Sequence, residues 1–387
     1  MIVCGVTIDS LFVTVLVTTL RVATPLTLGA LSGLFCERSG VVNIAIEGMM
    51  LLGAFSAYAV GSITGSIWLG LLAAVLSAGM LAALHALLSV TFKIDQIISG
   101  TVVNILAFGM TGYFYDQYYA RNAPPVSRLP IWEIPFLSQL DVYDKLFAHQ
   151  PIIWAALLLV AVVHFVLFYT RWGLRTRAVG EHPRAADTVG INVFFMRYAN
   201  VIIGGSIAGL AGAYLVAEVS SFSPGMTAGR GFIALAALIF GKWTPFGAWG
   251  AALLFGLASS AQINIQQCDT GTAAGSSFLD LLGGIPTWMV VVVAALIISL
   301  AALKRLNAMR PEALPSWLSA FASRTPLAIV SAMLIGLLLL GPLVVTLRQY
   351  NLLQLIGILP YLVTIVVLAG LVGRSTPPAA VGIPYDK

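Results

Sequence analysis

Charged residues are scarce in this chain. Of its 387 residues only 9% are Asp, Glu, Lys or Arg, 59% are apolar, and the mean hydropathy is +0.96. These values exclude a soluble globular protein. A membrane-spanning helix takes about 20 residues, so about eleven such helices would occupy a little over half of the chain. We therefore expect an all-α membrane protein with a single transmembrane domain over residues 1–387.

The common motifs of enzymes are also missing. No GxxxxGK[ST] occurs, so the chain cannot hold ATP phosphates as a P-loop does, and neither HExxH nor GxSxG appears. Cys4, Cys36 and Cys268 lie far apart without CxxC spacing, which predicts neither a disulfide framework nor a metal site. The basic residues are spread among loops rather than gathered with aromatics, which argues against nucleic acid. No cofactor is expected in this chain.

Apolar runs long enough to cross a bilayer recur along the sequence. We expect about ten transmembrane helices, about nine to eleven, with one or two of them broken or re-entrant. The run 230–241 is short and the run 44–61 opens with Gly and Asn, so these two are the candidates. The N-terminus lacks a basic segment and a cleavage pattern, so the first run is expected to be a retained span. The predicted spans are 8–31, 44–61, 66–90, 96–114, 151–170, 198–219, 230–241, 246–264, 286–303, 326–347 and 352–372.

Lys and Arg collect in two of the connecting segments. Segment 171–197 holds five arginines and segment 304–325 holds four basic residues, so both are expected in the cytoplasm. Loop 115–150 carries acidic and basic residues in near balance and is expected to be periplasmic. An even number of predicted spans separates the first two segments, and the same parity places the C-terminus in the cytoplasm. The prolines of the tail predict an irregular end that packs against the protein or hangs free.

Three polar side chains lie in or beside the predicted spans. Asn43 and Glu47 are four residues apart and would share one face of a helix, and Asn104 lies in another apolar run. A carboxylate at membrane depth costs about 2.5 to 3.5 kcal/mol unless it meets a partner or a wet cavity. These three residues are therefore candidates for the path of a translocated solute. For Asn104 the alternative is an ordinary hydrogen bond between helices. An alternative of equal weight is that Glu47 holds helices together by binding Arg21 or a helix N-terminus.

Other features of the apolar runs predict helix packing. Arg21 lies four residues before Pro25, so its guanidinium is expected to bind carbonyl groups that the proline leaves free. Small residues at 205, 208, 209 and 212 repeat at four-residue spacing, which predicts close helix contacts. Stretch 229–247 combines glycines, a proline and two cations, which predicts a bent element near the solute path.

Five ordered stretches of the chain carry a resemblance to a known family. They are ERSGVVNIAIEGMM, QIISGTVVNILAFG, RAVGEHPRAADTVGINV, GRGFIALAALIFGKWTPFG and LPYLVTIVVLAGLVGRSTPPAAVGIPY. These stretches resemble the permease subunit of bacterial ATP-binding-cassette importers for nucleosides, within the larger family of sugar and branched-chain amino acid permeases, whereas residues 266–355 fit that pattern poorly. The resemblance implies a second permease subunit, two ATPase subunits that hold ATP and Mg, an outer or periplasmic substrate-binding protein, and a location in the bacterial inner membrane.

The resemblance places the family's cytoplasmic coupling segment within 171–197. The residue types there agree with a docking element. Pro183 suits the first turn of a short helix, Arg184 offers two parallel donors to a carboxylate, and Gly190 suits the position just after a helix. An ordinary basic loop would explain the arginines but not this order of residues. The predicted coupling residues are Gly180, Glu181, Pro183, Arg184, Ala185, Ala186 and Gly190.

The resemblance implies alternating access driven by the partner ATPases. A sugar or branched-chain amino acid permease is the nearest alternative. An ion-coupled secondary transporter would need several acidic coupling sites in the membrane, whereas Glu47 is the only acid that we expect to be buried. A membrane-bound transferase would need a cluster of polar residues at one interface, and none is evident.

Overall fold

A computed structural model describes residues 2–3, 6–133, 148–271 and 376–386. The chain divides into two compact units, one of residues 1–8 with 262–359 and the other of residues 9–261 with 360–387. In the first unit, the described part consists of a short antiparallel pair, β1 (Ile2–Val3) with β2 (Val6–Thr7), and the end of one helix. All features discussed below belong to the second unit.

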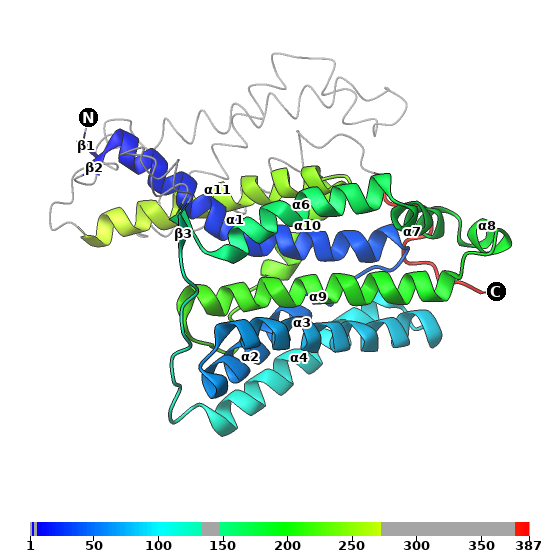
Figure 1. The fold of residues 1–387 in the computed structure, drawn as a ribbon, viewed down its shortest axis with the longest axis horizontal. Helices are drawn as coiled ribbons and strands as arrows, with labels where there is room; N and C mark the ends of the chain where they lie inside the picture. Colours follow the sequence, from blue (N-terminus) through cyan, green and yellow to red (C-terminus); the bar gives the residue numbers. More distant parts are fainter. Residues whose placement is uncertain (1, 4–5, 134–147, 272–375, 387) are drawn as a thin grey trace, which may run out of the picture. The chain divides into compact units, whose positions relative to one another are not determined.

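The second unit is a bundle of helices (Figure 1). Its described strands are β3 (Trp132–Glu133) and β4 (Ala148–His149), which pair antiparallel in the segment between α4 and α6. Strands were not predicted, but these are only two residues long. The helices are α1 (Ile8–Arg38), α2 (Ile46–Thr64), α3 (Ile67–Ala86), the π-helical turn η1 (Leu87–Thr91), α4 (Gln96–Tyr118), α6 (Pro151–Tyr169), α7 (Arg171–Glu181), α8 (Pro183–Thr188), α9 (Val193–Val219), α10 (Arg230–Phe240) and α11 (Pro245–Gly271).

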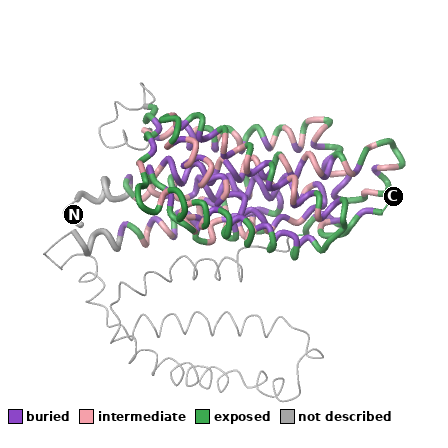
Figure 2. The backbone as a smooth tube through the Cα atoms, turned by 90° about the horizontal axis from the view of Figure 1, so that it is seen from below, coloured by how far each residue is buried: buried purple, intermediate pink, exposed green. Residues whose placement is uncertain are grey.

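Small residues bring α2, α3 and α9 into close contact, and Figure 2 shows that buried residues gather inside the bundle. A Cβ atom added to Gly209 would lie 2.3 Å from the Ala74 carbonyl oxygen of α3. One added to Gly212 would lie 1.8 Å from the Met50 carbonyl oxygen of α2. Apolar burial alone gives little drive for association in lipid, so such backbone contacts hold the bundle together. The predicted role of the repeated small residues in helix packing is confirmed.

Seven helices of the described residues are long and apolar enough to cross a membrane. The protein is thus a multi-pass membrane protein. α1 runs to Arg38 rather than ending near residue 31, and it ends where the chain turns at Ser39 and Gly40. The predicted spans 286–303, 326–347 and 352–372 and the basic segment 304–325 lie outside the described residues. The total of about ten helices therefore stays a prediction.

The two predicted broken spans differ in form. α10 has 11 residues, which is about 16 Å of helix and too short for a bilayer core of about 30 Å. α2 begins only at Ile46, after the non-helical residues 39–45. α2 therefore starts next to irregular backbone that is packed inside the protein, as such backbone requires at membrane depth, whereas several residues of the stretch 221–229 before α10 are exposed.

The segment 171–197 is largely helical, and the short helix expected at Pro183 is one of its three helical parts. It contains α7, α8 and the first turn of α9, and its last arginine, Arg197, is only 1% exposed within α9. In the predicted loop 115–150, α4 continues to Tyr118, and residues 134–147 lie outside the described residues. Apolar periodicity placed the starts of these elements but could not find helices made of polar residues.

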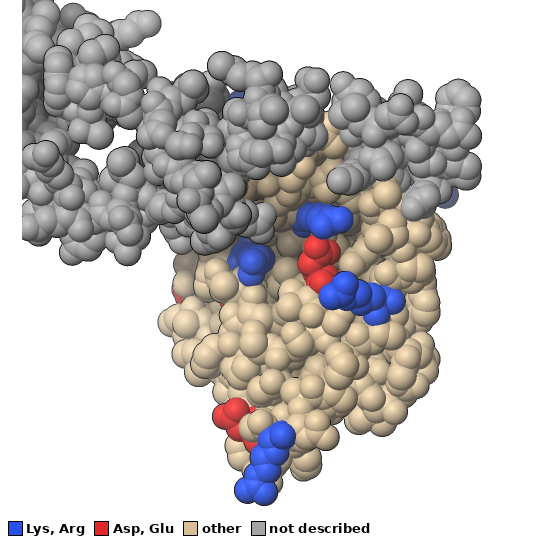
Figure 3. Space-filling view, turned by 90° about the vertical axis from the view of Figure 1, so that its left-hand side faces the viewer, with Lys and Arg blue, Asp and Glu red and all other residues tan. Residues whose placement is uncertain are grey.

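We call the end of the bundle that carries α7 and α8 the α7/α8 end. α1 and α6 finish there, α9 begins there, and the C-terminal residues 376–386 lie there (Figure 1). At the opposite end, few charged side chains are visible, and acidic and basic ones lie beside one another (Figure 3). This distribution agrees with the near balance of charge expected for loop 115–150.

Candidate functional site

Helix α7 is fixed to the end of α1 by a glycine. A Cβ atom added to Gly180 would lie only 2.2 Å from the Arg38 carbonyl oxygen, so no larger residue fits without movement of one of the two helices. Two arginines, Arg38 and Arg177, stack on the ring of Phe168, with their guanidinium carbons 5.7 and 5.0 Å from its centre. The position of α7 is therefore coupled to that of α1.

Helix α8 forms as the sequence predicts. Pro183 occupies its first turn, and Gly190 adopts φ +83° just beyond its end while its N–H donates to the Asp187 carbonyl at 2.9 Å. Ala186 is 3% exposed and packs inward, whereas Arg184 and Ala185 are exposed. Within the part of the chain that the structure describes, the Arg184 guanidinium makes no hydrogen bond or salt bridge. Its donors are therefore available to a partner.

The exposed side of α8 also holds an apolar residue that the sequence interpretation did not single out. Val189 follows α8 directly and is 74% exposed. Arginine is enriched at protein interfaces, and the buried centre of an interface is largely apolar. In sequence, Val189 resembles any residue of an apolar run, and only the end of α8 turns it outward.

The predicted coupling residue Glu181 binds the chain itself. Its Oε2 accepts a hydrogen bond from the Ala379 N–H at 3.0 Å, in the C-terminal tail. Of the predicted coupling residues, Gly180, Glu181 and Ala186 thus contact other parts of the chain. Arg184 and Ala185 face outward.

A buried acid at the α7/α8 end was missed in the sequence. Glu37 is 4% exposed, whereas Glu47, the one acid that was expected to be buried, is partly exposed. Its Oε2 accepts from the Trp243 Nε1–H, and the neighbouring Arg38 donates from Nε and Nη2 to the Trp243 carbonyl at 2.9 and 2.6 Å. Lys242 and Trp243 both have positive φ, 54° and 53°, so these contacts hold a strained turn between α10 and α11. The GKWTPFG motif carries this turn, and its Trp was the available signal.

Inside the bundle, Glu47 binds the N-terminus of α10. Its two carboxylate oxygens accept hydrogen bonds from the N–H groups of Gly229 at 2.8 Å and Gly231 at 2.6 Å. The first N–H groups of a helix lack intrahelical partners and favour a negative charge, so the carboxylate satisfies them. Of the two clamps considered for Glu47, the helix N-terminus is the one that forms, and Arg21 is not its partner. A role of Glu47 in solute contact stays a prediction.

Asn104 of α4 holds the beginning of α2. Its Oδ1 accepts from the Gly48 N–H at 2.7 Å, and its Nδ2 donates to the Ile44 carbonyl at 3.0 Å. Asn43 is fully buried, and its Nδ2 faces the sulfur atoms of Cys36 and Met49 at 3.3 and 3.6 Å. The structure thus brings Glu47 and Asn104 to one helix start and turns Asn43 toward the protein core. Their place in a solute path stays a prediction.

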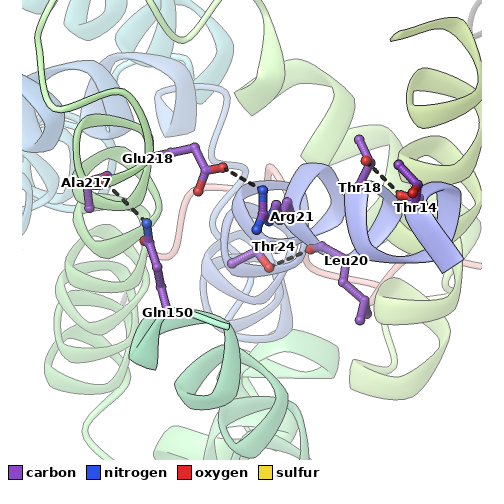
Figure 4. A network of polar contacts seen from close by, with 8 residues as sticks. All are labelled: Thr14, Thr18, Leu20, Arg21, Thr24, Gln150, Ala217 and Glu218. Atoms are coloured by element: carbon purple, nitrogen blue, oxygen red, sulfur yellow. Dashed lines mark hydrogen bonds and ion pairs between the residues drawn. The ribbon is translucent and has the colours of Figure 1, made fainter. Parts of the chain in front are cut away.

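Arg21 forms an ion pair rather than binding free carbonyls, which corrects the sequence interpretation. Its Nη1 lies 3.9 Å from Oε1 of Glu218, near the end of α9 (Figure 4). The two side chains are 45% and 35% exposed. In the same region Gln150 donates to the Ala217 carbonyl at 3.4 Å (Figure 4). The partner was not evident because Glu218 lies almost 200 residues further along the chain, which periodicity does not connect.

Comparison with known families decides the class of the protein. A family profile described as "Branched-chain amino acid transport system / permease component" matches residues 15–302, which is most of the chain. The chain belongs to this permease family. Its members are membrane components of transport systems, which accords with the seven candidate spans of the described residues. The resemblance found in the sequence is confirmed, and the family is one of transporters rather than enzymes.

Several curated permeases align with most of their own length. The guanosine ABC transporter permease protein NupQ of Bacillus subtilis is 42% identical over 257 residues, covering 63% of this chain and 80% of the relative. The nucleoside ABC transporter permease protein NupC of Lactococcus lactis is 38% identical over 269 residues, covering 67% and 85%. The putative glucose ABC transporter permease protein TsgC13 of Haloferax volcanii is 39% identical over 254 residues, covering 64% and 76%. No solved structure matches the chain.

Proposed function

We propose that this permease is the membrane subunit of an ATP-binding-cassette importer that takes up nucleosides by alternating access. The observation that carries the proposal is the identity of 42% and 38% to permeases named for guanosine and nucleoside transport. Both alignments cover at least 80% of the relative. The solute path is therefore proposed to serve a ribose with an attached base.

Energy for transport enters through a partner at α8. This chain has no P-loop, so ATP and Mg belong to separate ATPase subunits. The proposed contact consists of Arg184, Ala185 and Val189, which are exposed on one short helix and its end. Gly180 and Glu181 pass its movement to α1 and the tail, because both contact those parts directly.

The solute passes beside the start of α2. Glu47 and Asn104 hold α2, α4 and α10 together at that point, and Asn43 fixes the irregular backbone before α2. A rocking movement that begins at α7 and α1 reaches this point through residues 39–45. The three polar residues therefore control the shape of the path, and Glu47, which is partly exposed, contacts the solute.

The assembly follows from the class of transporter. A second permease subunit completes the path, and an outer or periplasmic substrate-binding protein delivers the solute. The membrane is the bacterial inner membrane, with the α7/α8 end in the cytoplasm. Four of the five arginines of segment 171–197 lie in α7 and α8, and the C-terminal tail lies at the same end, in keeping with a cytoplasmic C-terminus.

A sugar permease is the second candidate. The Haloferax relative named for glucose is 39% identical, which falls between the two nucleoside permeases. A path built from carboxylate, amide and backbone groups would suit sugar hydroxyls as well as ribose.

Uptake by the purified complex in proteoliposomes distinguishes these candidates. Labelled guanosine, another nucleoside, ribose, glucose and leucine are compared with ATP present inside or outside the vesicles. We expect nucleoside uptake only when ATP is on the α7/α8 side. Uptake of a sugar or leucine alone would replace the substrate assignment, and uptake by a complex whose ATPase cannot hydrolyse ATP would contradict the importer mechanism.

A further inference from the structure

The C-terminal residues 376–386 form a strap over the α7/α8 end. The strap lacks helix and strand and turns sharply at Gly382, which has φ +78°. Two internal hydrogen bonds shape it, from the Val381 N–H to the Pro378 carbonyl and from the Ile383 N–H to the Ala380 carbonyl. The predicted irregular end therefore packs against the protein instead of hanging free.

The strap binds the backbone of α7 and of the segment before α2. The Ala380 N–H donates to the Gly180 carbonyl at 2.9 Å, and the Gly382 N–H donates to the Gly40 carbonyl at 3.3 Å. Glu181 accepts from the Ala379 N–H. The strap thus joins the helix that leads into α8 to the irregular backbone that leads into α2.

Beneath the strap lies a buried arginine without an acidic partner in the described part of the chain. Arg197 of α9 is 1% exposed, and its Nη1 donates to the Ile383 carbonyl at 3.0 Å. Its Nη2 would lie only 2.9 Å from a Cβ atom at Gly40, so the guanidinium fills the space between α9, the strap and residue 40. Burial of a cation without an acidic partner is costly, so Arg197 depends on polar contacts such as its hydrogen bond to the strap. Removal of the strap would break this hydrogen bond and expose the guanidinium to water.

The end of the strap is anchored by Tyr385. This side chain is 5% exposed and packs with Val179 of α7 and Ala186 of α8, and its ring meets that of Phe194 edge to face at 5.6 Å between centres. The next residue, Asp386, forms an ion pair with Lys93 before α4, and this cation lowers the pKa of the Asp386 carboxyl. Asp386 is therefore charged at neutral pH. The strap thus reaches α7, α8, α9 and the segments before α2 and α4.

We propose that the strap fastens α7, α8 and the segment before α2 into one unit, so that movement of α8 is passed to α2 instead of being lost in local bending. Tyr385 and the strap backbone act as positioning groups and touch neither solute nor nucleotide. The proposal rests on the proposed docking of an ATPase at α8. It differs from a detachable tail that blocks docking, because Arg184 and Ala185 remain exposed with the strap in place.

The first test compares Tyr385→Ala with Ile383→Ala in the full complex. Ile383 is a matched control because its side chain is 55% exposed and only its backbone binds Arg197. For Tyr385→Ala we expect about tenfold lower uptake with ATP hydrolysis largely retained, so that more ATP is used per solute. Ile383→Ala should behave as wild type. A proportional loss of both activities, or normal uptake, would overturn the proposal.

The second test fastens the strap permanently. Lys93→Cys and Asp386→Cys, which replace the ion pair at the end of the strap, are joined by a short thiol crosslinker in a Cys4→Ser, Cys268→Ser background, with the fully buried Cys36 left in place. A unit that stays closed during the cycle predicts unchanged uptake after crosslinking. Loss of uptake that returns on cleavage of the linker would show instead that the strap must open.

A third measurement separates failure of this inference from failure of the proposed function. Amide hydrogen exchange of residues 171–190 needs no solute, and Tyr385→Ala should speed it while Ile383→Ala should not. Unchanged exchange in Tyr385→Ala would overturn the strap even if nucleoside uptake is normal. Faster exchange in Tyr385→Ala, together with a wild-type complex that takes up no nucleoside, would overturn the proposed substrate and leave the strap in place.

Discussion

Polar side chains near the start of α2 bind their own chain, whereas Arg184 on the exposed side of α8 makes no hydrogen bond or ion pair among the described residues. Glu47 and Asn104 together accept or donate four hydrogen bonds with the backbone of α2 and α10 and the residues just before these helices. Arg184 and Ala185 lie exposed beside Val189. Polar groups in lipid must form hydrogen bonds within the protein, while those at a membrane surface can bind a separate subunit instead. The first region therefore holds helices together, and the second is the proposed site of coupling.

The largest loss of stability is expected for Glu47→Ala. This change removes two charge-assisted hydrogen bonds and leaves the first N–H groups of α10 without partners, at a cost of about 3 kcal/mol. Glu47→Gln keeps one acceptor oxygen and should lose about half as much. Thermal unfolding of the purified permease in detergent measures both. Equal stability of Ala and wild type would show that the carboxylate does not hold α10.

Gly180→Ala should come next, with a loss of about 2 kcal/mol. The added Cβ would lie 2.2 Å from the Arg38 carbonyl oxygen and force α7 away from α1. Gly109→Ala is the matched control, since nothing lies within 4 Å of its added Cβ and alanine favours a helix. The same unfolding measurement applies. An equally large loss of stability in Gly109→Ala would show that the loss in Gly180→Ala does not come from the close contact of α7 with α1.

A smaller loss, about 1.5 kcal/mol, is expected for Asn104→Ala. The Gly48 N–H and the Ile44 carbonyl at the start of α2 would each lose a partner. Thr101→Ala on the same helix serves as the control, because its hydroxyl is exposed and binds only within α4. Faster hydrogen exchange at residues 44–50 in Asn104→Ala alone would localise the effect. Unchanged exchange there would contradict the clamp.

Arg184→Glu should have the smallest effect on stability, within about 0.5 kcal/mol, because its side chain is exposed and unpaired within the described residues. ATP-dependent uptake should nevertheless fall about tenfold or more, because the reversed charge repels an acidic site on the ATPase. Arg121→Glu, an exposed arginine between α4 and β3, makes the same charge change without this consequence. Normal uptake by Arg184→Glu would remove the proposed docking contact.

The sequence predicted the two regions to different depths. Apolar runs located the spans, and Pro183 and Gly190 located α8, because local chemistry determines where a short helix starts and ends. The sequence left Arg21 or a helix N-terminus as the partner of Glu47. It could not say which helix, because the N-terminus of α10 lies more than 180 residues away in the chain. Contacts at such separation, including Arg21 with Glu218 and Tyr385 with α7, depend on how the helices pack. No periodic pattern encodes them.

The central claim is that the exposed side of α8 docks an ATPase subunit. A photo-crosslinking amino acid at Ala185, with one at Arg121 as the control, tests this claim in membranes that contain the whole transporter. The claim predicts a crosslink from position 185 to the subunit that hydrolyses ATP and none from position 121. A position 185 that captures only lipid or this chain, in a complex that still transports, would contradict it.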